Sequence, residues 1–559
     1  MFVDARRLDE ASSIEAEVCV IGGGVGGITL ALEFDKRGVG VCLIESGGFA
    51  ADEATRDLYR GESIGLPYLF SDGCRSRFLG GSSNCWGGWC RPLEEEDFMR
   101  RAWVPYSGWP FAKSELQPYY DRSHGVLKLG PNRFDTAFWV DAIDRPDVRR
   151  HPFTSSGVID IISQFSPPVR FGKLYREALA RSKHVTVYLH ANAVDIETDG
   201  ARTVRRVKVK TLSGRTASVS ARVFVLATGG IENARLLLAS NKDRPDGLGN
   251  HNDLVGRFFM DHPRLMSGKI RFREAWSRNM LYDVKYHYQN DKVAAHGTCV
   301  AAQFSLSPEL QAKEHLLKAD ICFSSVFPGE DSDVTDALIR LKWRLEGTRQ
   351  PDYPLIGDMV TLASRPIDAA GFVAARYLRL RSLVKHARFL VIVEPPPDPD
   401  SRVVLSQERD QLGVNRVKVD WRLDTPVKRT IDRSLAIVAE ELTNAGVADV
   451  SLDPPIEGGD WPDTFKKEGC WHHIGTTRMH DSPKLGVVDR NCRVHGTNNL
   501  YIAGSSVFPT AGSDFPTITI VALTLRLADH IAAAMDRRFG AAAKPFDRGY
   551  ESKRPVCGV

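Results

Sequence analysis

The sequence predicts an α/β fold, α+β overall, in which a Rossmann-like nucleotide-binding domain alternates along the chain with a second domain built on a large antiparallel sheet with helices. Three observations predict it. A glycine-rich turn joins an apolar run to an apolar helix near the N-terminus. Strand-like runs recur at about 187–230 and within 263–465. The segment from Trp471 to His530 then closes the chain with a strand, a Gly-Ser turn and an apolar helix.

The composition is that of a globular protein with more than one core. The chain has 559 residues, of which 43% are hydrophobic and 26% charged, and its net charge is only +4. This length suggests two domains, and the charge does not indicate nucleic acid as a partner. We recognise no apolar span of about 20 residues and expect no transmembrane segment. The N-terminus lacks the apolar core of a signal peptide, which predicts a cytoplasmic location.

The ten cysteines carry no metal-binding pattern. They form no CxxC pair and no zinc-like spacing. We therefore expect mostly buried, reduced thiols and no metal site.

The N-terminal segment has the pattern of a dinucleotide-binding turn. An apolar strand at 18–21 runs into Gly22, Gly24 and Gly27, which have the GxGxxG spacing and precede an apolar helix. These glycines allow a tight turn, close approach of the backbone to a pyrophosphate, and close packing of helix on strand. A second strand ends at Glu45, about 20 residues further on, where an acid can bond a ribose hydroxyl.

The middle of the chain predicts a β-meander that ends beside the nucleotide. Three apolar runs between 187 and 230 are separated by turn signals at 198–200 and 213–214. The last run ends in ATGG at 227–230 and continues into an apolar helix. Gly229 is therefore a candidate for contact with the nucleotide, although an ordinary strand-to-helix turn would have the same pattern.

Five motifs in order resemble the glucose–methanol–choline (GMC) oxidoreductase family, and in particular its bacterial members that oxidise sugars and alcohols. They are the GGGVGG turn, RFLGGSSNCWGG at 77–88, the ATGG turn, HHIGT at 472–476 and NLYIAGSSVFPT at 499–510. The resemblance spans nearly the whole chain. It implies FAD as the cofactor and transfer of a hydride from an alcohol carbon to flavin N5.

The resemblance also implies that the two domains are discontinuous in sequence. We expect the Rossmann-like FAD-binding domain at 1–90, 186–262 and 466–545. The substrate-binding domain, with its large antiparallel sheet, is expected at 91–185 and 263–465. A C-terminal tail should follow at 546–559.

The family's base is a histidine in an HxxGT pattern, which here selects His472. Imidazole titrates near neutral pH and can take the proton that leaves the alcohol. His473 is expected to contact the substrate or support His472. Many relatives carry an Asn or His where this chain has Phe515, which cannot hydrogen-bond an alkoxide. Asp514 or His473 could replace it, Phe515 could stack on a substrate ring, or Phe515 could belong to the core.

The remaining candidate cofactor contacts also rest on the resemblance. The loop expected to cover the flavin contributes Gly81, Ser82, Ser83, Asn84 and Cys85. Some relatives have a histidine tethered to the flavin at the position of Cys85, so a cysteinyl linkage is an alternative to the non-covalent FAD that we expect. The adenine contact, made through the backbone, falls at Val194. The closing segment contributes Gly504, Ser505, Phe515, Pro516 and Thr517, and the helix after Pro516 should direct its positive end at the flavin.

The sequence therefore predicts an FAD-dependent alcohol dehydrogenase or oxidase acting on a CH–OH group of a sugar, glycoside, aminocyclitol or other polyol. An ammonium group on the substrate could meet Asp514. The alternatives are a non-redox lyase on the same FAD scaffold, and an enzyme for a non-sugar alcohol. Electrons would pass to oxygen or to a separate acceptor, because no haem-attachment motif is present. The oligomeric state stays open.

The basic run at 376–388 is the least typical part of the sequence. It contains five basic residues and no acid. We expect a solvated helix face, with a pocket lid, a membrane contact or an acceptor-docking site as alternatives.

Overall fold

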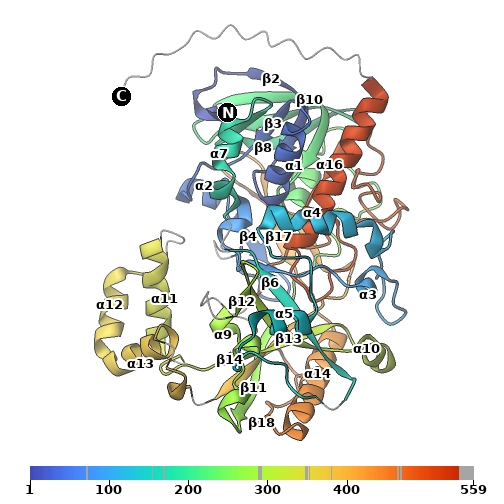
Figure 1. The fold of residues 1–559 in the computed structure, drawn as a ribbon. Coiled ribbons are helices and arrows are strands. Elements are labelled where there is room, and N and C mark those ends of the chain that lie inside the picture. The colour runs from blue at the N-terminus through green and yellow to red at the C-terminus, as the bar shows by residue number, and fades with distance from the viewer. Residues whose placement is uncertain are drawn as a thin grey trace.

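The computed structural model describes residues 1–70, 74–153, 155–167, 170–287, 293–330, 332–346, 351, 353–378, 380–384, 386–462, 465 and 469–539. The expected C-terminal tail at 546–559 lies outside this part of the chain. Figure 1 shows two regions, one above the other, each built on a sheet with helices.

The upper region is built on an eight-stranded sheet. Its strands, in spatial order, are β1 (Phe2–Asp4), β7 (Val185–Leu189), β3 (Val41–Ile44), β2 (Ser12–Ile21), β10 (Thr216–Leu226), β9 (Thr203–Lys210) and β8 (Asn192–Asp199), with β19 (Leu500–Ile502) paired to β10. The pairs from β1 to β10, and β10 with β19, are parallel. In register, Val18 lies beside Val41 and Ile21 beside Ile44, and all four are buried. Continuous burial of this kind is typical of a parallel sheet covered on both faces.

Helices from distant parts of the sequence pack in this upper region. They are α1 (Val25–Asp35), α4 (Gln117–Leu127), α8 (Gly230–Ala239) and α16 (Thr517–Phe539). Helix α16 packs against both α1 and α4 (Figure 1). The helix α4 thus lies on the nucleotide-binding side, although the sequence assigned 91–185 to the other domain. The domain boundaries themselves stay predictions.

Helix α16 corrects one expectation from the sequence. Its segment Thr517–Arg537 is long and apolar enough to cross a membrane by length and composition, so such a span does exist. Within the protein, however, 61% of an 18-residue apolar stretch of this segment is buried. Burial against α1 and α4 is the pattern of a core helix.

The predicted meander is present but starts later than expected. The first run divides into β7 and β8, because His190 between them takes a left-handed conformation with φ of 58°. The strand β7 then pairs in parallel with β3, and only β8, β9 and β10 form the antiparallel meander.

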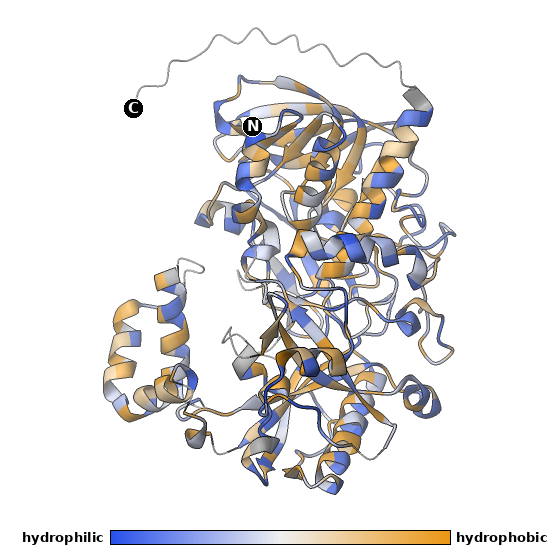
Figure 2. Ribbon diagram, in the orientation of Figure 1, coloured by the Kyte–Doolittle hydropathy of each residue, from blue (hydrophilic) through white to orange (hydrophobic). Residues whose placement is uncertain are grey.

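The lower region confirms the large antiparallel sheet. Its strands, in spatial order, are β18 (Ala448–Ser451), β11 (Arg264–Phe272), β15 (Ala387–Val393), β14 (Ala319–Ser325), β13 (Thr298–Leu306), β6 (Val158–Phe165) and β5 (Trp89–Cys90), with β12 (Ala294–Ala295) paired to β13. Helix α14 (Thr425–Asn444) packs on β13, β14, β15 and β18. Figure 2 shows hydrophobic residues on the strands of both regions.

Two runs predicted to belong to this sheet lie elsewhere. The strands β16 (Arg402–Arg409) and β17 (Asn415–Asp420) form a separate three-stranded sheet with β4 (Gly61–Ser63). The pairing of β17 with β4 is parallel. Alternation of polar and apolar residues predicted strands correctly here, but it does not identify the strand that each one pairs with.

The segment at 333–376 forms three helices at the side of the lower region (Figure 1). They are α11 (Asp333–Glu346), α12 (Leu355–Ser364) and α13 (Pro366–Arg376). Helix α12 exposes Leu355, Ile356, Met359 and Val360. The described residues of the basic run do not form one helix face as expected, because α13 ends at Arg376, a 3-10 turn spans Arg381–Leu383 and β15 begins at Ala387. Arg379 and Lys385 lie outside the described residues.

The remaining helices are short. They are α2 (Glu53–Asp57), α3 (Glu95–Phe98), α5 (Thr136–Ile143), α6 (Phe171–Leu174), α7 (Arg176–Arg181), α9 (Val284–His287) and α10 (Pro308–Glu314).

Candidate functional site

One large cavity lies between the two sheets and receives residues from both. Its nucleotide side is formed by the turn after β2, the end of β3, the loop at 81–87, the turn after β10, and residues 503–505 after β19. Its opposite side is formed by Arg264, Gln303, Cys322, Leu390 and Ile392 of the lower sheet. His472, His473 and Phe515 line it between these sides. The cavity therefore joins the predicted cofactor residues to the predicted catalytic ones.

The glycine-rich turn has the geometry that its spacing predicted. Gly22 has φ of +108°, and a Cβ on it would lie 2.5 Å from the carbonyl oxygen of Ala227. A Cβ on Gly27 would lie 1.8 Å from the Gly22 oxygen, so only glycine fits where the helix meets the strand. A Cβ on Gly24 would approach only Gly81, at 3.9 Å. The first and third glycines are thus required by packing, and the second leaves room beside the backbone.

This turn also offers hydrogen-bond donors to an anion. Gly24 caps α1 without a side-chain hydrogen bond, so the first N–H groups of the helix are not satisfied by a cap. Together with the helix dipole, these groups suit the pyrophosphate of a dinucleotide. The residues present therefore fit the nucleotide half of FAD.

Glu45 lies at the end of β3 and lines the same cavity. Its two oxygens accept hydrogen bonds from the backbone N–H groups of Gly23 (2.9 Å) and Gly47 (2.8 Å). Burial raises the pKa of its carboxyl group. The two amides fix the carboxylate beside the glycine turn, where it remains a candidate ligand for ribose hydroxyls.

The loop expected to cover the flavin lies against the glycine turn. A 3-10 turn spans Gly81–Asn84, and a Cβ on Gly81 would lie 2.9 Å from the Gly24 Cα. Gly81, Ser82, Ser83 and Cys85 line the cavity. The hydroxyl of Ser83 donates to Gly80 O and accepts from Phe171 N. The Asn84 side chain donates to Leu79 O and is not among the described cavity residues.

Two of the expected donors in this loop are therefore used to hold the loop in place. The Ser83 hydroxyl and the Asn84 amide bond to protein groups. Ser82 and the backbone remain the better candidates to meet a flavin from this side.

The adenine candidate, Val194, was expected to make its contact through the backbone, and this contact stays a prediction. Among the described residues, Ala191 and Ala193 line the cavity and Val194 does not. Gly229 lines it as expected.

The closing segment lies where the sequence placed it. Gly504, Ser505, Phe515, Pro516 and Thr517 all line the cavity, and α16 begins at Thr517. The Ser505 hydroxyl donates to the carbonyl of His473 at 2.7 Å. This contact joins the nucleotide end to the segment that carries the histidines.

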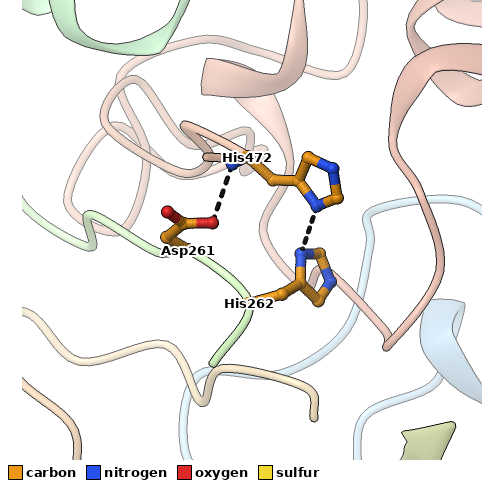
Figure 3. A group of neighbouring side chains, drawn as sticks. All are labelled: Asp261, His262 and His472. Atoms are coloured by element: carbon orange, nitrogen blue, oxygen red, sulfur yellow. Dashed lines mark hydrogen bonds between the residues drawn. The ribbon is translucent and has the colours of Figure 1, made fainter. Parts of the chain in front are cut away.

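His472 belongs to a cluster built by distant segments, of which Figure 3 draws Asp261, His262 and His472. Its Nδ1 lies 2.9 Å from Nδ1 of His262, and its backbone N–H donates to Asp261 Oδ1 at 2.7 Å. Tyr68 donates to the other oxygen of Asp261 at 2.9 Å. Burial lowers the pKa of His472 well below its usual value, and the neighbouring His262 and His473 lower it further. His472 is therefore neutral at working pH, as a base must be.

Asp261, His262 and His472 could also be considered as metal ligands. Two nitrogens bound to one zinc ion at about 2.0–2.1 Å in tetrahedral geometry lie more than 3 Å apart. The 2.9 Å between the two Nδ1 atoms is instead a hydrogen-bond distance. We therefore describe the group as a hydrogen-bonded cluster.

His473 also lines the cavity, and its ring lies among aromatic side chains. Its ring lies 6.2 Å from that of Phe259 and 5.9 Å from that of Tyr68. Burial lowers its pKa to about 3. Its Nε2 is buried and has no hydrogen-bond partner among the described residues, so it can accept or donate one hydrogen bond to a bound molecule.

Phe515 and Asp514 are neighbours in sequence but lie in different environments. Phe515 stacks on Trp89 with 5.0 Å between ring centroids and meets the edge of His472 at 5.4 Å. It lines the cavity, so the interpretation as a pure core residue was wrong. Asp514 is buried and does not line the described cavity. Its carboxylate contacts Lys318 Nζ at 2.7 Å and Arg91 Nε at 3.2 Å.

The expectation that Asp514 meets a substrate ammonium group is therefore corrected. Its charge is already opposed by two buried cations, and it is shielded from the cavity.

Sequence reasoning missed several residues of this site. His262, Asp261 and Tyr68 build the cluster, and Trp89, Arg264 and Gln303 line the cavity. A signal existed in MDHPR at 260–264, where an acid and a histidine directly follow an apolar run. Nothing in that pattern indicates His472 as the neighbour.

Comparisons with known proteins agree with this geometry. Residues 17–246 match a family model described as FAD dependent oxidoreductase, and residues 397–524 match GMC oxidoreductase. The chain is 26% identical to paromamine 6'-oxidase of Streptomyces fradiae over 93% of this chain and 92% of that protein. It is 26% identical to 6'''-hydroxyparomomycin C oxidase of Streptomyces lividus, covering 92% of each.

More distant relatives and solved structures share the architecture. The chain is 22% identical to 2-methyl-1,2-propanediol dehydrogenase of Mycolicibacterium austroafricanum, over 94% of this chain and 96% of that protein. Pyridoxine 4-oxidase from Mesorbium loti superimposes with a TM-score of 0.53 at 17% identity, covering 93% of this chain and 99% of that one. A formate oxidase superimposes with a TM-score of 0.53 at 18% identity, covering 95% of this chain and 100% of that one. These structures support the fold. The chain therefore combines an FAD dependent oxidoreductase domain at 17–246 with a GMC oxidoreductase domain at 397–524.

Proposed function

We propose that the protein oxidises a CH–OH group of a sugar, glycoside, aminocyclitol or other polyol, with His472 as the base. The observation that carries the proposal is the placement of a neutral, half-buried His472 in the cavity that the nucleotide-binding turn also lines. Bound FAD would supply the hydride acceptor. The chain's own residues then have to bind the alcohol, orient its carbon and remove its proton.

His472 has one ring nitrogen left for the substrate. Because Nδ1 is in contact with His262, Nε2 is the atom that can accept the hydroxyl proton. We assign the second polar contact with the alcohol oxygen to His473, which lines the cavity and whose buried Nε2 has no partner among the described residues. In this role His473 replaces the Asn or His that many relatives have at the position of Phe515.

Aromatic residues form the wall of the site beside His472. Phe515 stacks on Trp89, and both line the cavity. Such a wall excludes water and offers a flat apolar surface on which the CH face of a sugar ring can pack.

Two of the relatives support the substrate class. They are named for oxidation of paromamine and of 6'''-hydroxyparomomycin C, and the chain covers more than nine-tenths of each. The diol dehydrogenase relative leaves a small non-sugar alcohol as the competing class.

An anaerobic spectrum tests the proposal. The FAD-loaded protein would be mixed in turn with a neutral sugar, an aminocyclitol glycoside and a small diol. We expect a polyol to bleach the flavin and the His472→Ala variant to bleach far more slowly with the same polyol. Bleaching by simple alcohols alone would replace the sugar proposal, and turnover without bleaching would favour the lyase.

We further propose that FAD is held without a covalent bond. The Cys85 thiol lines the cavity, and its Sγ lies 3.3 Å from Ser82 O. Denaturing the holoprotein should release all flavin into the supernatant. Flavin that stays with the wild-type protein but is released from Cys85→Ala would establish the cysteinyl linkage instead. A cytoplasmic location stays a prediction of the sequence.

A further inference from the structure

His262 is fully buried, and its two ring nitrogens have different partners. Its Nε2 lies 2.9 Å from the carbonyl oxygen of Gly512, and its Nδ1 lies 2.9 Å from Nδ1 of His472 (Figure 3). A carbonyl oxygen can only accept a hydrogen bond. The proton on the His262 ring must therefore be on Nε2.

This assignment determines the protonation of the next ring. Burial lowers the pKa of His262 to about 4, so the ring is neutral and carries a single proton. With that proton on Nε2, the Nδ1 of His262 is a lone-pair acceptor. The Nδ1 of His472 must then be the donor across the 2.9 Å contact. A neutral His472 that carries its proton on Nδ1 has a lone pair on Nε2.

We propose that His262 is a positioning residue that, held by the Gly512 carbonyl, fixes His472 in the tautomer whose Nε2 can accept the substrate's hydroxyl proton. The inference rests on the proposed function of His472 as base. It adds a residue that touches neither substrate nor cofactor and acts only through the ring of His472. The same Nδ1–H to Nδ1 bond persists after Nε2 takes the proton, so the imidazolium keeps a partner at each stage.

The preceding residue holds His472 at a second point. Asp261 accepts the backbone N–H of His472 at 2.7 Å while His262 accepts from its ring. Tyr68 fixes the other Asp261 oxygen at 2.9 Å. Asp261 and His262, which are consecutive in sequence, thus fix the backbone and the ring of His472. Together they restrict rotation about its side-chain torsions.

Two nearly isosteric substitutions test this role. In His262→Asn, the amide oxygen can occupy the place of Nδ1 and accept from His472, whereas His262→Leu fills a similar volume without an acceptor. We expect His262→Leu to slow flavin reduction by a polyol on the order of 100-fold, the scale of a misplaced general base. His262→Asn should retain most of the wild-type rate. Equal loss in both variants, at equal FAD content and melting temperature, would overturn the proposal.

A second measurement needs no substrate and so separates this inference from the proposed function. Protein labelled with ¹⁵N-histidine, with the His472 signals assigned by their absence in His472→Ala, reports which ring nitrogen carries the proton. We expect a protonated Nδ1 and an unprotonated Nε2 in the wild type and in His262→Asn. In His262→Leu the proton should move, at least in part, to Nε2. A wild-type His472 protonated on Nε2 would overturn the inference even if the enzyme oxidises polyols.

Discussion

At the nucleotide end of the cavity the protein surface is mostly backbone, whereas at the histidine end it is made of side chains from distant segments. The turn at 22–27 and the loop at 81–87 lie against each other through glycines, with a Cβ on Gly81 only 2.9 Å from Gly24. His472, by contrast, depends on Asp261 and His262, about 210 positions away in sequence. The nucleotide end therefore depends on few particular side chains. At the histidine end, the loss of one side chain leaves its hydrogen-bonding partner unsatisfied.

This difference predicts how each end responds to change. At the nucleotide end, adding an atom should matter most, because the backbone segments are in contact. At the histidine end, removing a hydrogen-bonding or charged atom should matter most, because each buried polar group depends on its partner.

The largest effect is expected for Gly27→Ala. The added Cβ would lie 1.8 Å from the Gly22 oxygen, so the turn or α1 must move. We expect a loss of about 3 kcal/mol or more in the free energy of unfolding, and little FAD in the purified protein. Gly125→Ala in α4 is the matched control, since a Cβ there meets nothing within 4 Å. Normal FAD content in Gly27→Ala would contradict the account of this end.

His472→Ala should have the next largest effect, on rate rather than stability. Loss of the base should slow anaerobic flavin reduction by about 1000-fold with FAD content unchanged. His473→Ala removes the neighbouring ring and should cost about tenfold, because we assign it a binding role. If the two variants were equally slow, the division of roles between the histidines would be wrong.

Lys318→Met tests the buried charges behind the histidine end. Lys318 contacts Asp514 at 2.7 Å and Asp97 at 3.1 Å, and all three are buried. Removing one partner of a buried ion pair costs about 3–5 kcal/mol. We expect urea unfolding to show this loss, and Lys318→Met combined with Asp514→Asn to recover part of it. The exposed Lys313→Met should change little.

Acid should destabilise the histidine end gradually. Burial lowers the pKa of His262 to about 4 and of His473 to about 3. Below pH 6.5 the unfolded chain binds a proton at each that the folded protein does not, so the free energy of unfolding falls as the pH falls. The loss is about 1.4 kcal/mol per histidine for each pH unit. Replacing His473 with Phe should reduce the slope of melting temperature against pH between 6.5 and 4; an unchanged slope would contradict its burial as a neutral ring.

Phe515→Leu should produce the smallest effect. It removes the stacking on Trp89, a contact worth about 0.5–1.5 kcal/mol, while keeping an apolar wall. We expect KM for the polyol to rise up to about tenfold, with a smaller change in kcat. A large fall in kcat with KM unchanged would mean that Phe515 orients His472 rather than the substrate.

The sequence predicted the nucleotide end better because its determinants are local. Gly22, Gly24 and Gly27 lie within one short turn, and the backbone around Gly22 and Gly27 leaves no room for a Cβ. Pro516 likewise marks the start of α16 by its own geometry. The same local reasoning predicted α/β class and an antiparallel second sheet, but it assigned β16 and β17 to the wrong sheet.

The histidine end could be predicted only in part because contacts between distant segments leave no local pattern. The HxxGT motif identified His472, yet MDHPR gave no indication that His262 would meet it. Neighbours in sequence also diverged. Phe515 faces the cavity, while Asp514 is buried with Lys318. Such choices depend on which way one side chain points.

The most direct test of the account is the rate at which a polyol reduces the bound flavin when the hydrogen on its CH–OH carbon is replaced by deuterium. The account predicts anaerobic bleaching by the ordinary polyol, slower bleaching by the deuterated one, and neither at a comparable rate in His472→Ala. Equal rates for the two isotopes in all accessible conditions, or a polyol consumed without any bleaching, would contradict hydride transfer from a carbon held beside His472.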